Sequence, residues 1–354
     1  MAPESYNVSV PGSMMLMGEH AVLHGKQALV CAVNQRLRVQ LTPVNTNVIT
    51  ITDSRLGTLV TTVNAVHMQN PFKFVTAAIL LFKSQLSTGF TLDINSDFSS
   101  TIGLGSSAAV TVATIAALGQ WLNVIPLPAD DILDMALQVI LAVQGSGSGA
   151  DVAASIYGGV LGYSVSREDD ANYKVCRTGD AEVGGTARRA QRSEHDGGCR
   201  SGRTRRHINL LPTIPNLTAV YSGYKTPTPE VIRIVTAAQQ QDPDRFSTIF
   251  SKIHDVAMQA VNAITERNWP LLGQLFNQHQ TLQAELGVSD QTLDHLVQLL
   301  TKQPQIHGAK ISGAGLGDCV IGLGEVQENL IAANDGMLQF AVRIDPEGIK
   351  YASN

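Results

Sequence analysis

Residues 103–109, Gly-Leu-Gly-Ser-Ser-Ala-Ala, combine residue types that could bind a phosphate group. Two glycines allow a tight turn and let the backbone approach a ligand closely. Two hydroxyl side chains and a run of good helix formers follow, so the segment predicts a loop that opens into a helix N-terminus. The free N–H groups and the positive dipole at such an end favour an anion. An ordinary turn before a core helix is the alternative for this segment taken alone.

Three further segments carry polar side chains beside glycines. Residues 11–25 contain the pair Glu19 and His20, residues 148–151 end in Asp151, and residues 310–319 contain another glycine-rich run. A Glu-His pair in a turn is ordinarily solvated surface, a carboxylate after a glycine can be a helix cap, and the last run can be a plain strand-turn element. Glycine-rich runs near both ends of the chain nevertheless favour a nucleotide site.

Hydrophobic periodicity predicts strands and helices around these segments. Strands are expected at residues 6–10, 28–33, 37–41, 48–52, 58–63, 90–94, 158–165, 217–221, 310–311, 319–323 and 338–344. Helices are expected at residues 72–85, 106–122, 130–143, 151–157, 229–240, 246–267, 271–286 and 290–301. The first strand is expected to enter a turn at Pro11-Gly12. The glycine-rich loop therefore lies between a strand and a helix, and Asp151 lies at the start of a short helix.

Length and composition favour a globular enzyme. A chain of 354 residues predicts two domains or one large α/β domain. The net charge of −5 argues against general affinity for nucleic acid, and no apolar run approaches the roughly 20 residues of a membrane span. Because the N-terminus lacks a basic region followed by an apolar core, the cytoplasm is the expected location. The four cysteines lack metal-site spacing, and Cys31 and Cys319 are expected to be buried thiols.

Residues 167–207 differ in composition from the rest of the chain. They hold nine of its sixteen arginines among small and polar residues, with almost no large apolar side chains. Such a segment cannot bury enough surface to offset its ordering entropy, so it predicts a flexible insertion. A basic arm for nucleic acid or an acidic partner is one alternative. A misread coding frame is another, and resequencing the coding DNA tests it.

Three of these segments, in order along the chain, resemble the motifs of the GHMP small-molecule kinases. They are residues 11–25, the loop at 103–109, and residues 310–319. Within the first, Gly-Glu-His-Ala-Val is most similar to the mevalonate kinase branch. The resemblance implies an α+β, two-domain GHMP kinase fold, with an N-terminal domain like the second domain of ribosomal protein S5 and a ferredoxin-like C-terminal domain. We expect the N-terminal ATP-binding domain at 1–166, the basic insertion at 167–207 and the C-terminal domain at 208–354.

The resemblance also implies roles for single residues. ATP and substrate would lie in the cleft between the domains, with Mg²⁺ at Ser107. Asp151 would be the catalytic carboxylate that accepts or polarises the proton of the attacking hydroxyl. Lys225 is a second catalytic candidate, although a plain turn is an equal alternative for residues 222–228. The substrate contacts would be Glu19, His20, Ser148, Gly149 and Thr228, and the ATP contacts Gly103, Leu104, Gly105, Ser106, Ser107, Ala108, Gly313, Ala314 and Gly315.

Four positions depart from the family pattern. Ser13 stands where most opening motifs have a lysine, and Ile140 stands where mevalonate kinases often have a metal-binding glutamate. Residues 99–102 lack the usual proline and glycine, and Asp318 replaces a glycine of the last motif. The loss of an oriented cation could slow the reaction by roughly two to three decades. Lys225 or an arginine of the insertion is the expected replacement.

Together these features predict ATP-dependent phosphorylation of a small hydroxy acid, with mevalonate as the expected acceptor. Phosphomevalonate kinase is an alternative, because residues 147–154 also resemble that branch, but basic residues are sparse near the motifs. A non-catalytic homologue that binds ATP or a metabolite is another, favoured by Ser13 and Ile140. The expected partner is the small-molecule substrate, without nucleic acid or membrane, and a homodimer rests on analogy alone.

Overall fold

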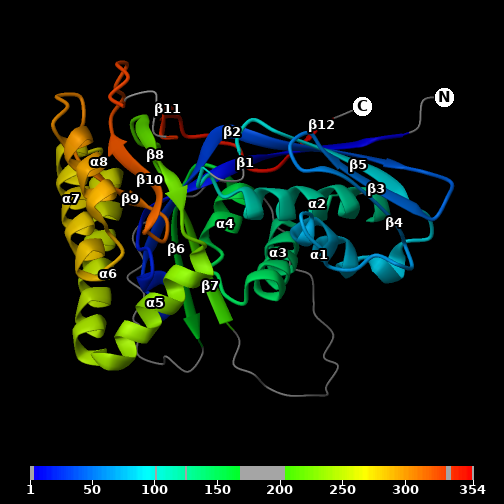
Figure 1. Cartoon of the computed structure of the whole chain (residues 1–354), viewed down its shortest axis with the longest axis horizontal. Coiled ribbons are helices and arrows are strands. Elements are labelled where there is room, and N and C mark those ends of the chain that lie inside the picture. Colours follow the sequence, from blue (N-terminus) through cyan, green and yellow to red (C-terminus); the bar gives the residue numbers. More distant parts are fainter. Residues whose placement is uncertain (1–3, 100–101, 124–125, 168–203, 332–335, 353–354) are drawn as a thin grey trace, which may run out of the picture.

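Two β-sheets, one of eight strands and one of four, organise the chain. The computed structural model describes residues 4–99, 102–123, 126–167, 204–331 and 336–352. In Figure 1 the strands of the larger sheet lie at the top and centre, and the smaller sheet with its helices lies at the left. The predicted two-domain α+β fold is confirmed.

The eight-stranded sheet is built mainly from the N-terminal part of the chain. Its order is β12-β1-β2-β5-β3-β4, and β6 pairs with both β2 and β7. Among the described strands only the pairing of β3 with β5 is parallel. Along β5 the side chains of Phe90, Leu92 and Ile94 are buried and those between them are not, as expected of a half-buried strand. The strands are β1 (Tyr6–Met17), β2 (Ala28–Pro43), β3 (Val48–Asp53), β4 (Gly57–Thr62), β5 (Phe90–Ser96), β6 (Val160–Arg167), β7 (Thr204–Leu211) and β12 (Lys350–Ala352).

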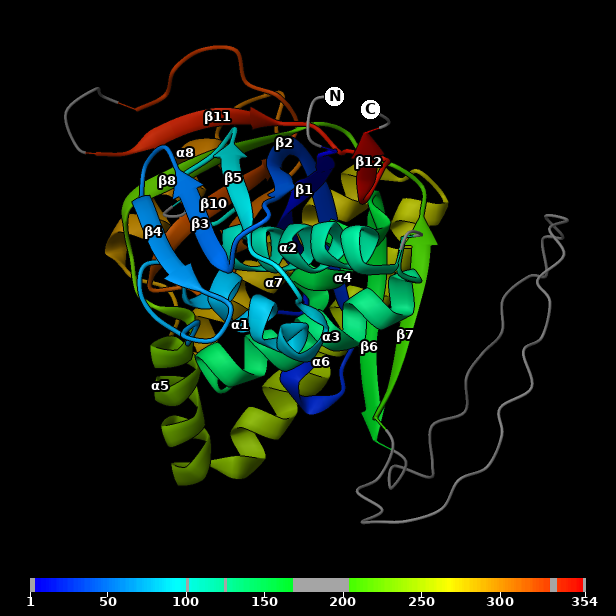
Figure 2. The ribbon, with the colours of Figure 1, turned by 90° about the vertical axis from the view of Figure 1, so that its right-hand side faces the viewer.

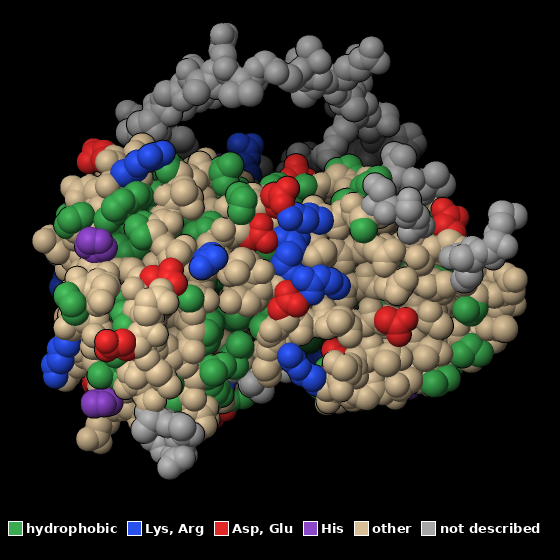
Figure 3. Space-filling view, turned by 90° about the horizontal axis from the view of Figure 1, so that it is seen from above, with side chains coloured by type: hydrophobic (Ala, Val, Ile, Leu, Met, Phe, Trp, Pro, Cys, Tyr) green, Lys and Arg blue, Asp and Glu red, His purple; other side chains and the backbone are tan. Residues whose placement is uncertain are grey.

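Helices cover one face of this sheet, and no described helix covers the other (Figure 1). α2 is the central one, and its residues 111–119 are all buried, as expected of a helix that is apolar on every side. Figure 3 looks onto the uncovered face, where basic and acidic side chains are interspersed. The covering helices are α1 (Lys73–Leu81), α2 (Ser106–Asn123), α3 (Ala129–Gln144) and α4 (Ala150–Tyr157), and two short 3₁₀ turns are η1 (Ala21–His24) and η2 (Lys83–Gln85).

The four-stranded sheet is antiparallel, in the order β11-β8-β10-β9. α7 and α8 pack against β9 and β10. Three helices start at a capping side chain, Asp242, Asn268 or Asp290, which accepts a hydrogen bond from the N–H group three residues further on. None of the helices in the described ranges is both long and apolar enough to cross a membrane. The elements are β8 (Leu217–Lys225), β9 (Ala309–Ser312), β10 (Gly317–Leu323), β11 (Leu338–Val342), α5 (Thr228–Gln241), α6 (Pro243–Thr265), α7 (Trp269–Glu285) and α8 (Gln291–Thr301).

The first strand runs further than the sequence predicts. β1 continues through Pro11 and Gly12 to Met17, so the turn predicted there is wrong. A register shift between these two residues bends the strand instead, and beyond it the N–H of Ser13 donates to the carbonyl of Leu104 at 3.1 Å. The strands predicted at 28–33 and 37–41 are likewise one strand, β2, because it follows β1 on both sides of this shift.

The arginine-rich segment is described only at its ends. Residues 168–203, which make up most of the predicted flexible insertion, lie outside the described residues. Residue 167 ends β6 and residues 204–207 begin β7, and these two strands run side by side (Figure 2). The described ends are therefore strand, contrary to the prediction of a flexible insertion over 167–207. β7 also crosses the predicted boundary at residue 208, and β12 returns residues 350–352 to the larger sheet.

Candidate active site

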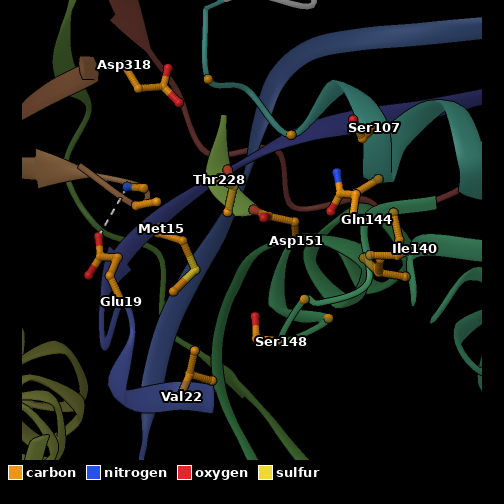
Figure 4. A pocket seen from close by; sticks show the side chains of 18 of the residues that line it. Met15, Glu19, Val22, Ser107, Ile140, Gln144, Ser148, Asp151, Thr228 and Asp318 are labelled. Atoms are coloured by element: carbon orange, nitrogen blue, oxygen red, sulfur yellow. Dashed lines mark hydrogen bonds between the residues drawn. The ribbon is translucent and has the colours of Figure 1, made fainter. Parts of the chain in front are cut away.

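One pocket between the two domains brings together segments that are far apart in the sequence (Figure 4). Of the predicted site residues only Gly315 does not line it. The carbonyl oxygen of Val288 lies 2.4 Å from where a Cβ on Gly315 would be, so this glycine packs against the loop before α8. The predicted residues that line the pocket are Glu19, His20, Gly103, Leu104, Gly105, Ser106, Ser107, Ala108, Ser148, Gly149, Asp151, Lys225, Thr228, Gly313 and Ala314.

The predicted loop before α2 has the backbone of an anion site. Gly103 and Gly105 have φ angles of 69° and 63°, in the left-handed region that glycine adopts without strain. A Cβ on Gly105 would lie 1.9 Å from Oγ of Ser13, so the loop also needs glycine for space. Leu104 between them is buried and anchors the loop, and α2 starts at Ser106. The first N–H groups of a helix of 18 residues therefore lie at the pocket wall.

Asp151 lies at the centre of the pocket, on the first turn of α4 (Figure 4). Ser13, which is fully buried, donates a hydrogen bond from Oγ to Oδ1 of Asp151 at 2.9 Å. Burial raises the pKa of Asp151, and the hydrogen bond from Ser13 and the charge of Lys225 oppose that rise. The carboxylates of Asp318 and Glu19 raise the pKa further. The serine at the position of the expected lysine is thus a neutral donor to the predicted catalytic carboxylate.

Glu19 is part of a buried cluster at the edge of the pocket. Its Oε1 accepts a hydrogen bond from Nζ of Lys310 at 2.6 Å, and the two side chains are 3% and 0% exposed. Burial, the largest influence, would raise the pKa of Glu19, but the charge and hydrogen bond of Lys310, together with smaller contributions from other neighbours, outweigh it and the pKa is lowered. Nε2 of His279 accepts the N–H of Gly18 at 2.9 Å, so this imidazole is neutral there, and burial lowers its pKa to about 4. The cluster joins the turn after β1 to β9 and α7, and so holds the two domains together.

His20 links the same two parts of the chain. Its Nε2 donates to the carbonyl oxygen of Ala314 at 2.8 Å, in the glycine-rich turn between β9 and β10. The φ of His20 is 61°, a strained conformation for a residue with a side chain. Burial lowers the pKa of His20, with partial opposition from this hydrogen bond. The predicted Glu-His pair is therefore not solvated surface, because both residues are buried at the pocket wall.

Lys225 and Asp318 form an ion pair on the C-terminal side of the pocket. Nζ of Lys225, the last residue of β8, lies 2.8 Å from Oδ2 of Asp318. Burial raises the pKa of Asp318, and the charge of Lys225 opposes that rise. Sequence analysis noted Asp318 as a departure from glycine but did not place it in the site. Its position directly after a glycine-rich motif was the available signal.

The α3 side of the pocket carries Ile140 and Gln144, close to Ser107 (Figure 4). Ile140 is 6% exposed and has no ligand atom, so α3 supplies no carboxylate at the position of the expected glutamate. Gln144 was not singled out from the sequence. Its spacing of four residues from Ile140 places both on one helix face, which could have identified it.

The residues near the phosphate loop offer oxygen atoms suited to Mg²⁺. The hydroxyl of Ser107 and the carboxylate of Asp151 line one pocket, and Mg²⁺ in nucleotide sites is held by one or two such groups together with phosphates and water. These donors fit a Mg²⁺ ion held largely through a nucleotide. In the described part of the chain, no group of three or more His, Cys, Asp or Glu residues could hold a metal by itself. Cys31 and Cys319 are buried free thiols, as predicted.

Comparisons with known proteins agree with this geometry. The model of the GHMP kinases N terminal domain matches residues 73–159, and that of the GHMP kinases C terminal matches residues 259–336. A mevalonate kinase from Aeropyrum pernix is 27% identical over 356 residues, which cover 97% of both chains. The solved structure of the Methanococcus jannaschii mevalonate kinase has a TM-score of 0.74 at 21% identity and covers 97% of this chain and 99% of that one.

The Lin0012 protein from Listeria innocua has a TM-score of 0.78 at 20% identity and covers 99% of this chain and 100% of that one. At these identities the two solved structures show a shared fold. The family models match in order on the two halves of the chain, and the curated relative aligns from end to end. This chain therefore belongs to the GHMP kinase family.

Proposed function

We propose that this protein transfers the γ-phosphoryl group of ATP to a hydroxyl group of mevalonate. The observation that carries the proposal is the position of Asp151, which lies in one pocket with the phosphate loop and with the Glu19-His20 turn. A carboxylate there can take the proton of a hydroxyl that is held next to a bound triphosphate. The curated relatives named mevalonate kinase support mevalonate as the acceptor.

The chain's own groups divide the work of phosphoryl transfer, which depends mainly on positioning and charge stabilisation. The N–H groups at the start of α2 bind the phosphates, and the Ser107 hydroxyl would hold Mg²⁺, which would neutralise phosphate charge. Asp151 accepts the hydroxyl proton. Because Oδ1 of Asp151 accepts the hydrogen bond from Ser13, the other carboxylate oxygen is oriented toward the acceptor.

The charge of the pocket favours mevalonate over phosphomevalonate. Among the described residues that line it, Lys225 is the only lysine or arginine. The wall beside Glu19 is largely apolar, with Met15, Val22 and Leu23. A phosphorylated acceptor would bring a second group of about −2 charge into this space, and that group needs cations of its own.

The test is ADP release from Mg-ATP with mevalonate and, separately, with phosphomevalonate, each at saturating concentration. We expect turnover with mevalonate and at most a trace with phosphomevalonate. Turnover with phosphomevalonate alone would replace the proposal with the second acceptor. If ATP binds in calorimetry and neither acceptor is turned over, the proposal fails in favour of a non-catalytic homologue, for which Ser13 and Ile140 are the supporting residues.

A further inference from the structure

The pocket must stabilise phosphoryl transfer with few cations. Ser13 occupies the position of the expected lysine, and among the described lining residues Lys225 alone carries a permanent positive charge. An oriented charge stabilises a transition state better than a freely moving one, because no reorganisation is needed during the reaction. A lysine side chain is long and flexible, so its ammonium group contributes fully only if another group fixes its position.

The backbone brings Asp318 to Lys225. Lys225 pairs with Gly317 across β8 and β10, and the register shifts between Gly317 and Cys319, so Asp318 is in the irregular part of the strand. Such a bulge redirects the side chain that it contains. Oγ1 of Thr226 also donates to the carbonyl of Leu316 at 2.6 Å, which fastens the residue after Lys225 to the turn before Asp318.

Asp318 is unfavourable for folding on three counts. Its φ is 70°, in the region where a residue with a side chain is strained and glycine is favoured. Its residue exposure is 8%, so the carboxylate has lost most of its hydration. Oδ1 is buried without a hydrogen-bond partner in the described structure, while Oδ2 binds Lys225. A strained, poorly solvated carboxylate at this point is a mark of function.

Asp318 also touches the phosphate loop. A Cβ on Gly103 would lie 2.0 Å from Oδ1 of Asp318, so the carboxylate is packed against this loop. It therefore adds negative charge beside the place that binds the triphosphate. In Figure 4 Asp318 and Ser107 are seen on opposite sides of Asp151 in the pocket.

We propose that Asp318 is a positioning residue that holds the Lys225 ammonium group at the phosphoryl-transfer end of the pocket, in place of the lysine missing at position 13. The inference rests on the proposed kinase function. The ion pair keeps the ammonium group of Lys225 away from the triphosphate of bound ATP before the reaction. It holds the group near the atoms on which negative charge develops during transfer. Asp318 thus weakens ATP binding and accelerates the chemical step. If its role were purely structural, its removal would weaken ATP binding and slow the chemical step together.

A double-mutant cycle on the full chain tests this through Asp318→Asn, Lys225→Met and the double variant. ATP dissociation constants come from calorimetry, and kcat comes from ADP release. We expect Asp318→Asn to bind ATP roughly threefold more tightly and to lose about tenfold in kcat, and Lys225→Met to lose roughly a hundredfold in kcat. In the double variant Asp318→Asn should add nothing to the loss in kcat, because the residue it positions is gone. Asp97→Asn removes an exposed carboxylate that pairs with Arg38 and is the matched control.

Weaker ATP binding in Asp318→Asn, or losses that multiply in the double variant, would overturn the proposal. Thermal unfolding of each variant identifies losses that arise from misfolding, and Asp318→Gly, the residue of the family, provides a second variant if Asp318→Asn does not fold. Turnover of phosphomevalonate in place of mevalonate would count against the proposed acceptor only, and the cycle would then use phosphomevalonate. Absence of turnover with both acceptors would overturn the proposed function and the role of Asp318 together, whereas an unchanged kcat in Asp318→Asn would overturn the role of Asp318 alone.

Discussion

Two lysine–carboxylate pairs border the same pocket, and they differ in how far water reaches them. Lys310 and Glu19 are 0% and 3% exposed, and the pair connects β9 with the turn after β1. Lys225 and Asp318 are 31% and 12% exposed, and the pair connects β8 with β10 beside the phosphate loop. The first pair, called the sealed pair below, lies between the domains. The second, called the open pair, faces the pocket.

The two carboxylates respond to burial in opposite ways. In both, burial disfavours the charged form. The pKa of Glu19 is nevertheless lowered, because Lys310 and the other neighbours of Glu19 together outweigh burial, whereas the pKa of Asp318 is raised because Lys225 does not outweigh it. The fold therefore favours the charged form of Glu19 and disfavours the charged form of Asp318. A pair of the first kind stabilises the native state, and a pair of the second kind adds little to stability and serves to hold its lysine at the pocket.

Asp151 lies within reach of both pairs, and its removal should have the largest effect on activity. We expect Asp151→Asn to lower kcat by about 10³-fold, because an amide cannot accept the hydroxyl proton. ATP binding should persist, since the phosphate loop and both ion pairs remain. ADP release and calorimetry measure the two quantities, with the exposed Asp131→Asn on α3 as control. Retention of more than a tenth of the activity would remove Asp151 from its proposed role.

The sealed pair should dominate stability. Lys310→Met leaves Glu19 buried without its cation, and we expect a loss of about 3 kcal/mol or more in the free energy of unfolding. Lys225→Met, in the open pair, should cost less than about 1 kcal/mol, because Lys225 is 31% exposed and Asp318, whose pKa burial raises, can take up a proton when its cation is removed. Urea unfolding of both variants gives the comparison. Equal losses would show that exposure does not distinguish the pairs, and recovery in Lys310→Met with Glu19→Gln would confirm that the stranded charge is the cause.

The pH dependence of kcat/KM tests the role of Ser13. If Asp151 must be deprotonated to act, kcat/KM falls as the pH drops through its pKa, which burial raises. The Ser13 hydrogen bond lowers this pKa, so Ser13→Ala should move the acidic limb of the profile to higher pH. Ser155→Ala is the control, because Ser155 is an equally buried serine on α4 that donates to the carbonyl of Pro11. A limb that stays in place in Ser13→Ala would mean that Asp151 is not the titrating group.

Much of the fold and the chemical core of the site could be predicted from the sequence. The loop before α2 could be identified because glycine, hydroxyl and helix-forming residues act there through local backbone preferences. The helix starts at Asp242 and Asp290 are local in the same sense. Local sequence patterns suffice to predict a structure that is determined by residues close together along the chain.

The remaining features depend on contacts between residues far apart. The continuation of β1 through Pro11 is set by its pairing with β2 and by the contact of Ser13 with Leu104, which no local pattern reveals. The partners of Glu19 lie about 260 and 290 residues further along the chain, so its burial could not be deduced from a Glu-His pair in a turn. The pairing of Lys225 with Asp318 arises from strand register in the same way.

A substitution in the open pair should have the smallest effect on the free energy of unfolding, and it should stabilise the fold rather than destabilise it. Asp318→Gly removes a strained φ of 70° and a poorly solvated carboxylate, so it should raise the free energy of unfolding by about 1 kcal/mol near pH 8. Because the folded pKa of Asp318 is raised, its charge destabilises the fold above that pKa, and the gain should shrink as the pH falls through it. Arg267→Gly, at an exposed residue with φ 55°, relieves strain without removing a carboxylate and should show no such pH dependence. If urea unfolding shows that Asp318→Gly is destabilised at pH 8, then Lys225 and Asp318 stabilise the fold as Lys310 and Glu19 do, and the distinction between the two pairs fails.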